Sequence, residues 1–595
     1  MLEPDSRSLL SELLRPPAGF RLSHAVGTSF TMTLEAALAI PLAFARSVET
    51  DDRVGILGAV RRATQRIDLF AQAGCLGLGA ASDLVAVLEP MIHSVRMPPG
   101  RLFHPKVWFL EFESDGELRY RFICSSRNLT NDRTWDAVIA LDGSPGENLH
   151  ERDAASNEAM ASMLTWLIRD DRASPKLNPA RARRIARLAE SWRGIRWEHP
   201  DRVRKLRVHC LGVGAPNQES PRLLQKPGLK AAIISPFVSD QGIAQLRARP
   251  GRETSLISRP ESLDALGETT LDGLALRVLD DMVDLALEDA ETGTRSRDEL
   301  RGLHAKVVVH DHAHEQSSML VGSANATDAA WSRNVEVMVE VEGPTRHFGV
   351  DAVVSALTPM IDAYETDGDV EPTDAEQAAL ALDTALRDLA RARLFVRVHS
   401  PQPHSVSLWA SDVPPIDERF TISWRMLSLP DPVLTPLPTT DVPYLSGPLA
   451  LEQITPFIMV ALRDPEGRRR ETVVVAEVLD DVAERGDAII AAHLTGPDAV
   501  SRFIRLMLQD VGTVLDGPGG GGGAFGSAFG RGVAESGSGL LELLVRASAT
   551  NRDGLAEVKG VLDQLAGDPS LDALPAGFAD VWDAVVSAAG SRVAS

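Results

Sequence analysis

Alternating runs of apolar and polar residues, separated by turns, predict most of the secondary structure of this chain. Residues 303–340, LHAKVVVHDHAHEQSSMLVGSANATDAAWSRNVEVMVE, predict two strands, a turn, a short helix and a third strand. The same order occurs at residues 103–141, from FHPKVWFLEF through YRFICSSRNLT to TWDAVIAL. Before each repeat, a buried strand alternates with helices, as in RIDLFAQAG and LKAAIISPF. This alternation indicates two α/β units, each with one sheet between helices.

Other elements follow from the same patterns. We expect helices at residues 84–95, 151–169 and 178–193, and a strand at 303–309 that carries His304 and Lys306. After an acidic, Pro-containing linker and a helix at 376–392, short alternating runs from LFVRV to AIIAAHL predict a small β-sandwich.

With 595 residues the chain is too long for one core. The expected fold is α/β, with two units forming a bilobal core, followed by a β-rich domain and a C-terminal helical module. The expected boundaries are 1–200 and 201–365 for the two units, 376–510 for the β-sandwich-like domain with flanking helices, 517–532 for a Gly-rich linker and 533–595 for the helical module.

Composition narrows the class of protein. The apolar stretch LEAALAIPLAFA is about half as long as a membrane span, and no positively charged leader precedes it. We therefore expect a cytoplasmic protein with no membrane span. The three cysteines, Cys75, Cys124 and Cys210, have no CxxC spacing, so neither a disulfide framework nor a zinc site is indicated. Cys124 ends a predicted strand and is expected to be buried.

The net charge of −22 argues against a whole-surface affinity for nucleic acid or anionic lipid. Residues 169–207 differ, with thirteen Lys or Arg against five acids. Two interpretations stay open. The stretch binds a phosphate backbone, which makes nucleic acid the expected partner, or it is a solvated basic face that pairs with acidic neighbours.

Polar residues near the ends of predicted strands form the same constellation twice. The first copy holds His104, Lys106, Ser126, Asn128 and Asp136, and the second holds His304, Lys306, Asp311, Ser323, Asn325 and Glu336. One HxK triplet is common by chance, whereas two complete copies in one order are not.

In these residues the chain resembles the phospholipase D superfamily, whose signature is H-x-K-x4-D followed by G-S-x-N. The second copy fits this signature, whereas in the first copy Glu111 stands in place of the Asp and Ser125 in place of the Gly. The resemblance covers about residues 20–345. It implies two phospholipase D-like units that face one another across a pseudo-twofold axis.

Hydrolysis of a phosphodiester without a metal or other cofactor needs a nucleophile, a proton donor and cations. The resemblance implies that His104 is the nucleophile, forming a phosphohistidine, and that His304 is the general acid. Lys106 and Lys306 would hold the phosphoryl oxygens, with hydrogen bonds from the Ser and Asn residues. Asp136 and Glu336 are placed to fix the histidine tautomers, and Asp311 and Glu111 are the alternatives for this role.

The substrate stays open between classes. The basic stretch favours DNA, RNA or a soluble phosphodiester. So does the similarity of SRNLTNDRTWD and SANATDAAW to tyrosyl-DNA phosphodiesterases and bacterial phospholipase D-like nucleases, some of them in phage defence or restriction. A phospholipase or phosphatidyltransferase remains the alternative, with Trp108, Trp135 and Trp331 as candidates for an apolar entrance. Two further alternatives are a phospholipase D-like fold that binds its ligand without catalysis and a subunit that protein partners activate through the C-terminal domains. An oligomer is not required, because one chain carries both motifs.

Other histidines lie outside the two motifs. His310, His312 and His314 alternate as zinc ligands can, but we expect them in a solvated polar turn. His24 and His93 are expected to be structural.

Overall fold

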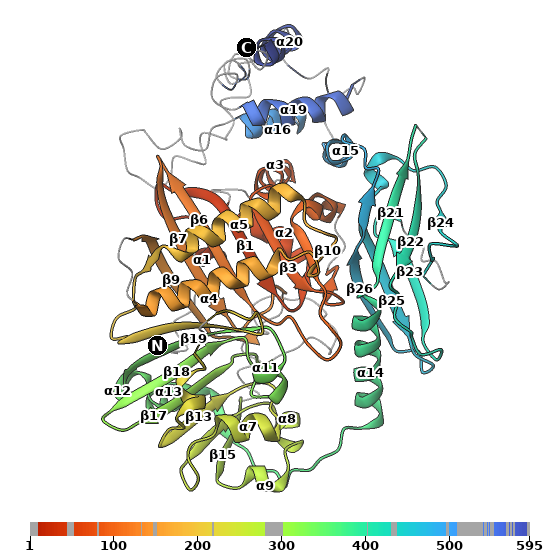
Figure 1. The fold of residues 1–595 in the computed structure, drawn as a ribbon. Helices are drawn as coiled ribbons and strands as arrows, with labels where there is room; N and C mark the ends of the chain where they lie inside the picture. Colours follow the sequence, from red (N-terminus) through yellow and green to blue (C-terminus); the bar gives the residue numbers. More distant parts are fainter. Residues whose placement is uncertain are drawn as a thin grey trace.

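The structure is a computed structural model of the chain. It describes residues 10–44, 53–79, 83–131, 134–146, 151–216, 219–279, 302–401, 403–429, 437–494, 499–508, 540, 544, 547, 552–566, 571, 574 and 578–591. The predicted α/β class is confirmed. Figure 1 shows one large sheet (red to orange) above a second (yellow to green), with a sandwich of two smaller sheets (cyan) beside the first. Within those ranges, no helix is long and apolar enough to cross a membrane.

The first large sheet has eight strands. In spatial order they are β10 (Ala173–Ser174), β5 (Ile92–Val95), β3 (Ile67–Gln72), β1 (Arg21–Ser29), β6 (Val107–Ser114), β7 (Glu117–Ser125), β9 (Val138–Pro145) and β11 (Ile195–Trp197). The strands β1, β3 and β5 are parallel, and β6, β7 and β9 continue the sheet antiparallel.

Both faces of this sheet are buried, because successive residues on a strand point to opposite sides. Ala25 and Leu69 pack in one core, and their neighbours Val26 and Phe70 pack in another. One core also takes in the helices α2 (Leu34–Phe44) and α3 (Arg53–Thr64) and the 3-10 helix η1 (Asp83–Met91). The other takes in α4 (Glu151–Leu167) and α5 (Pro179–Arg193), which Figure 1 shows in front of the sheet.

The second large sheet repeats this order. Its strands are β12 (Lys205–Leu211), β19 (Glu336–Pro344), β18 (Gln316–Gly322), β17 (Val307–His312), β13 (Lys230–Ile234), β14 (Thr254–Ile257), β15 (Leu274–Leu279) and β20 (Ile361–Ala363). Here β13, β14 and β15 are parallel, and β17, β18 and β19 are antiparallel. Its helices are α6 (Arg222–Gln225), α7 (Asp240–Leu246), α8 (Pro260–Asp264), α9 (Glu268–Leu271), α11 (Asp328–Ser332), α12 (Thr345–Phe348) and α13 (Val350–Leu357).

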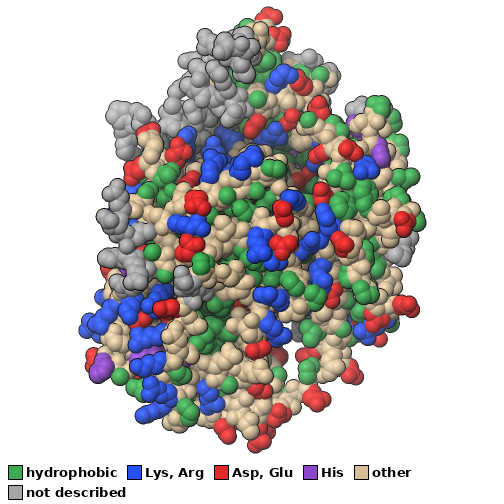
Figure 2. All heavy atoms as spheres, in the orientation of Figure 1, with side chains coloured by type: hydrophobic (Ala, Val, Ile, Leu, Met, Phe, Trp, Pro, Cys, Tyr) green, Lys and Arg blue, Asp and Glu red, His purple; other side chains and the backbone are tan. Residues whose placement is uncertain are grey.

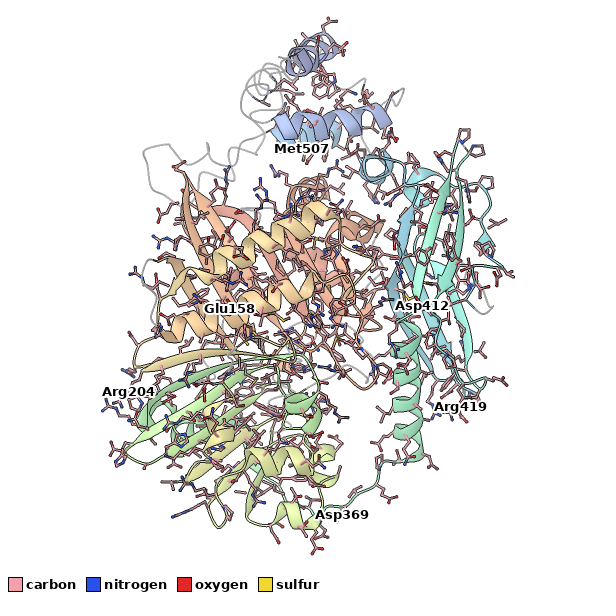
Figure 3. The ribbon with its side chains drawn as sticks, in the orientation of Figure 1. Glu158, Arg204, Asp369, Asp412, Arg419 and Met507 are labelled. Carbon is pink, nitrogen blue, oxygen red and sulfur yellow. The ribbon has the colours of Figure 1, made fainter. Side chains whose placement is uncertain are left out.

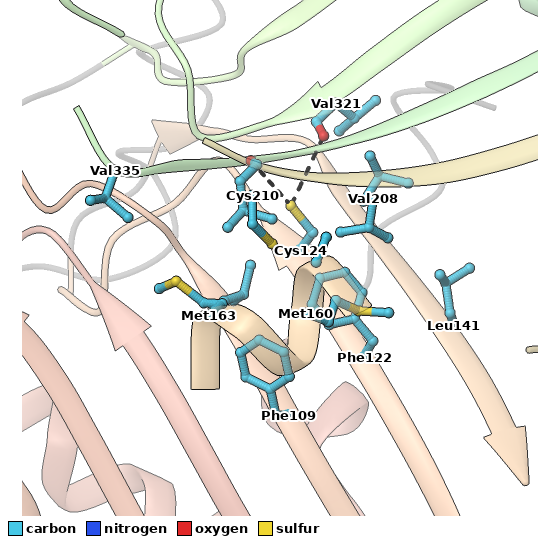
Figure 4. Packing of buried hydrophobic residues seen from close by; sticks show 14 of the residues in the cluster. Phe109, Phe122, Cys124, Leu141, Met160, Met163, Val208, Cys210, Val321 and Val335 are labelled. Atoms are coloured by element: carbon cyan, nitrogen blue, oxygen red, sulfur yellow. Dashed lines mark hydrogen bonds between the residues drawn. The ribbon is translucent and has the colours of Figure 1, made fainter. Parts of the chain in front are cut away.

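A single hydrophobic core joins the two large sheets. Cys124 on the first sheet is buried, as predicted, and its Sγ lies 3.9 Å from the carbonyl oxygen of Val321 and 3.7 Å from that of Val337 on the second. Figure 4 shows Phe109, Phe122 and Met160 of the first unit packed close to Val208, Cys210 and Val335 of the second unit. The two sheets therefore fold against each other rather than as separate bodies.

The remaining chain packs against the first unit. The sandwich joins β24 (Tyr444–Leu445), β22 (Ser405–Ser411), β21 (Arg393–His399) and β27 (Glu477–Leu479) to a sheet of β23 (Thr421–Met426), β25 (Phe457–Arg463) and β26 (Arg469–Val475). Its flanking helices are α14 (Asp374–Leu389), α15 (Arg485–Ala491) and α16 (Ala499–Leu508). A buried ion pair of 2.6 Å joins Arg485 to Glu89 on η1. The helices α19 (Arg552–Gln564) and α20 (Phe578–Ser591) add to the core that contains α3, and Figure 1 shows them above it. The predicted Gly-rich linker lies outside the described residues.

Several predictions differ from the structure in the type of element or in the setting of a residue. Residues 84–95 form η1 and then β5, because Pro90 interrupts the helix and all four residues of β5 are buried beside β3. The run AIIAAHL, expected as a strand, lies largely in α15, where its alanines favour a helix. His310 and His312 are not in a solvated turn but buried in β17, bonded to Gly228 N–H and Ser318.

Candidate active site

The two HxK triplets lie in the links that lead into the central antiparallel strands. His104 and Lys106 precede β6, and His304 and Lys306 precede β17, so the predicted strand at 303–309 begins only at Val307. Before the second triplet, β16 (Gly302–Leu303) pairs in parallel with β8 (Thr134–Trp135) of the first unit. Phe103 makes the same kind of bridge to Val335. Each histidine is thus held beside the carboxylate-bearing link of the other unit.

Each histidine meets a carboxylate from the opposite unit. Nδ1 of His104 lies 2.9 Å from Oε2 of Glu336, and Nδ1 of His304 lies 3.4 Å from Oδ1 of Asp136. A carboxylate at Nδ1 favours the tautomer with its proton there. Nε2 of each ring is then the nitrogen that remains for chemistry.

The serines of the two motifs hold the carboxylates rather than the histidines. The hydroxyl of Ser323 donates to Glu336, and that of Ser126 donates to Asp136 at 3.3 Å. Two residues that the sequence reasoning did not assign to the site help them: Asn334 Nδ2 donates to Glu336 at 3.3 Å and Thr134 Oγ1 to Asp136 at 3.2 Å. Each stands two positions before its acid, and that spacing is the signal that could have identified them.

The two lysines are buried and folded back on their own histidines. Lys106 Nζ donates to the carbonyl of His104 at 2.8 Å, and Lys306 Nζ to that of His304 at 2.6 Å. Burial and the charge of Lys306 hold the pKa of Lys106 well below its ordinary value. Burial lowers the pKa of Lys306 to about 7, although Asp136 and Glu336 oppose this shift.

The histidines are neutral in the free protein at neutral pH. Burial lowers the pKa of His104 to about 4 despite Glu336, and burial and the charge of Lys306 lower the pKa of His304 to about 4. The charge of each lysine lowers the pKa of both histidines, so both lysines lie within electrostatic reach of both rings. A bound anion would raise all four pKa values, because opposite charge favours the protonated forms.

The asparagines differ between the units. Asn128 Oδ1 accepts the Thr31 N–H at 3.4 Å. Asn325 Oδ1 is buried and, among the described residues, has no hydrogen-bond partner. The ring of Phe30 lies against the first triplet, 5.0 Å from the His104 ring and 5.6 Å from Lys106 Nζ. Phe30 is another residue that the sequence reasoning missed.

Asp311 and Glu111 are not brought to the histidines. Asp311 accepts hydrogen bonds from the Ser317 hydroxyl at 2.7 Å and the Val350 N–H at 3.1 Å, at the start of α13. It lies five residues along the chain from Lys306, or about 16 Å at the rise of a strand. Glu111 accepts from the Ser23 hydroxyl at 2.7 Å. The HxK-x4-acid spacing thus places these acids far along the strands, in structural roles.

The basic stretch is mostly paired with acids. Arg181 bonds to the buried Asp68 at 2.8 Å, and Arg193 bonds to Glu158 at 2.9 Å. Figure 3 labels Glu158 on α4 and Arg204 at the edge of the second sheet. Figure 2 shows Lys and Arg side chains gathered near that edge, which is the end of β12 remote from Glu336. This pattern fits the second interpretation, a basic face over α5 and β12 that pairs with acids, rather than a positively charged surface around the histidine and lysine cluster.

Other candidates are accounted for by packing. His24 and His93 both bond to Asp68, at 3.0 and 2.9 Å, in the structural role that was expected. Trp108 is buried in the core of the first unit and does not line an entrance. Trp135 and Trp331 are partly buried, and Trp331 donates to the carbonyl of Asn325 at 2.9 Å.

No family model matches the chain, and no curated protein matches its sequence. Among solved structures, it is similar to yeast tyrosyl-DNA phosphodiesterase at 14% identity and a TM-score of 0.35, over 57% of this chain and 86% of that one. It is similar to phosphatidylserine synthase of Haemophilus influenzae Rd KW20 at 15% identity and a TM-score of 0.34, over 62% and 88% of the chains.

Proposed function

We propose that this chain is a metal-independent phosphodiesterase that acts through a covalent phosphohistidine, and that it is a nuclease on DNA or RNA. The observation that carries the proposal is the convergence of two neutral imidazoles and two lysines, with each Nδ1 held by a carboxylate from the opposite unit. This arrangement leaves two Nε2 atoms for a nucleophile and an acid, and two cations for one phosphoryl group.

In the proposed first step, Nε2 of His104 attacks phosphorus and the bond to the leaving oxygen breaks. His304, protonated when the anionic substrate binds, gives its proton to that oxygen. In the second step, His304 takes a proton from water, the water oxygen attacks phosphorus, and the phosphorus–nitrogen bond breaks. Lys106 and Lys306 stabilise the charge on the non-bridging oxygens throughout. His104 has the role of nucleophile because the motif resemblance implies it, and its carboxylate contact, 2.9 Å against 3.4 Å for His304, is the shorter one.

The decisive experiment offers labelled single-stranded DNA, duplex DNA and RNA to the purified chain with EDTA present. Cleavage that survives EDTA and disappears in His104→Ala supports the proposal. A matched control is His209→Ala, because His209 makes a similar buried contact of 3.0 Å with Glu340, away from the site. Loss of activity in both variants would point to unfolding rather than to chemistry.

Absence of cleavage with all three nucleic acids would overturn the nuclease assignment. Phosphatidyl vesicles would then test the lipid alternative, and added cell extract would test activation by a partner. For the biological setting we propose phage defence or restriction, on the basis of the motif resemblance to nucleases in such systems. Plating efficiency of phage on cells with wild-type protein or with His104→Ala tests it.

A further inference from the structure

Strand register relates each residue beside the site in one unit to a residue in the other unit. At one such pair of positions the two units carry different side chains. Ser29 ends β1 and Ser235 follows β13, and each hydroxyl donates to the carbonyl two residues on, at 2.5 Å to Thr31 and 2.7 Å to Phe237. Each hydroxyl also accepts a backbone N–H from the loop that carries the Ser-x-Asn motif, at 2.9 Å in both units. Phe237 therefore occupies the position that Thr31 has in the first unit.

A second equivalent position also differs. By the pairing of β3 with β1 and of β14 with β13, Arg259 corresponds to Gln72. Gln72 accepts the N–H of Phe103 at 2.8 Å, and Arg259 Nη2 donates to the carbonyl of Leu303 at 2.9 Å. Both contacts are to the residue directly before a histidine of the site. A neutral amide in one unit is thus replaced by a guanidinium in the other.

Phe237 and Arg259 touch each other at the edge of the second triplet. The guanidinium carbon of Arg259 lies 5.1 Å from the centre of the Phe237 ring, and Phe237 is 45% exposed. The backbone around it is fixed, since Ser262 also donates to the carbonyl of Pro236 at 2.9 Å. The charge of Arg259 contributes to the lowered pKa of Lys306, so it lies within electrostatic reach of the site.

We propose that Phe237 and Arg259 form a ledge that binds an unpaired nucleobase of a single-stranded substrate, with the guanidinium against a neighbouring phosphate. This inference rests on the proposed function and names its substrate class. Bases in a duplex have both faces covered, whereas an unpaired base can stack on an exposed ring. With His304 as the acid, the ledge takes the leaving-group side of the scissile phosphate.

The guanidinium beside the ring favours a nucleobase over an acyl chain. A lipid chain gains from a continuous apolar surface, and here the neighbour of the exposed ring is a cation that matches a phosphate. The difference between the units also fits an asymmetric substrate. The second unit places an exposed ring beside a guanidinium, whereas Phe30 of the first unit is half-buried beside the buried Lys106.

The test measures binding, so that it remains informative if no cleavage is found. Full-length His104→Asn protein is titrated with a short fluorescent single-stranded oligonucleotide, followed by anisotropy. Adding Phe237→Ala should weaken binding about tenfold to a hundredfold, the range expected for loss of one base–aromatic stack. Phe237→Tyr should keep most of the affinity because it keeps the ring. Val442→Ala is the matched control, an exposed apolar residue of the sandwich region.

Arg259→Gln, which copies the first unit, should also weaken binding and reduce its dependence on salt. Equal affinity of Phe237→Ala and its parent for the oligonucleotide would overturn the ledge even if the nuclease is real. Equally strong, Phe237-dependent binding of duplex DNA would overturn the single-strand assignment. If Phe237→Ala weakens binding of phosphatidylglycerol vesicles but leaves binding of the oligonucleotide unchanged, the nucleobase ledge is overturned in favour of a lipid-binding surface.

Discussion

Nδ1 of His104 lies 2.9 Å from Oε2 of Glu336, although the two residues belong to different sheets. The contact between His304 and Asp136 repeats this exchange in the other direction. Neither unit alone supplies the carboxylate that its own motif histidine contacts. Under the proposed function, docking of the two sheets is therefore a condition for the chemistry as well as for stability.

Replacing Glu336 with Gln should lower kcat by about tenfold to a thousandfold, because the imidazole of His104 loses the group that fixes its tautomer and supports its basicity. Steady-state kinetics on an oligonucleotide measure the effect. Glu340→Gln is the matched control, since Glu340 is buried on the same strand and bonds His209 instead. Equal losses of kcat in the two variants would contradict the assigned role of Glu336.

Loss of His304 should trap the covalent intermediate. With an aryl phosphodiester, whose leaving group needs no proton, His304→Ala should still be phosphorylated but not turn over, because no group activates water. Intact-mass measurement should show the adduct, and peptide mapping should place it on His104. If the His104→Ala variant instead carries an adduct on His304, and the His304→Ala variant carries none, the roles of the two histidines are interchanged.

Binding of a phosphodiester should weaken as pH rises through about 7. Lys306 has a pKa of about 7 in the free protein, so its positive charge is present below that pH and lost above it. Anisotropy with His104→Asn protein and an oligonucleotide between pH 6 and 9 measures the change. Lys306→Arg should remove this dependence because an arginine stays charged. If the affinity of the protein that retains Lys306 does not change between pH 6 and 9, the lysine keeps its proton throughout and its pKa is not lowered to about 7.

The free energy of unfolding should fall as pH drops from 6.5 to about 4. Both buried histidines have pKa values of about 4 when folded, against an ordinary value of 6.5. In that window the unfolded chain binds protons that the folded chain does not, so acid favours unfolding. The contribution is at most about 3 kcal/mol for each histidine. Denaturant titrations of wild type and His104→Asn should converge towards pH 4, and parallel curves would contradict the lowered pKa.

Asp311→Ala should destabilise the fold and leave the chemistry intact. Its carboxylate bonds Ser317 and the N–H of Val350, so its loss should cost about 1–3 kcal/mol of unfolding free energy. Thermal unfolding and kcat at a temperature well below the midpoint measure the two effects. A large fall in kcat without a fall in stability would instead make Asp311 part of the chemistry.

The sequence allowed the α/β class and the two sets of motif residues to be predicted, because each set is local in the chain. His104 and Lys106 are two positions apart, and Ser126 and Asn128 follow one strand later. The partner of each histidine was not predictable in this way. Asp136 and Glu336 occupy the same place in their repeats, so only the three-dimensional exchange between sheets decides which ring each one meets.

The predictions that differ from the structure fail for physical reasons. Asp311 matched a motif by spacing, but a strand moves its side chain away from Lys306 by about 3.3 Å per residue. His310 and His312 were expected in a solvated turn at the end of a strand, yet the strand continues through both of them and neighbouring polar groups bond them inside the sheet. Phe30 and Arg259 had no spacing signal, since their place beside the site comes from strand pairing.

The core around α3 contains Leu14 near one end of the chain and Leu555 and Val585 near the other. During synthesis, β1, α2 and α3 leave the ribosome long before α16 and α19, which pack beside α3 in the same core. The side of α3 that meets α16 stays uncovered until those helices emerge. A fragment that ends before α16 would hold both histidine–lysine pairs of the candidate site and would expose this apolar surface. Such a fragment is prone to aggregation and proteolysis, so the C-terminal helices contribute to the lifetime of the part of the chain that carries the site.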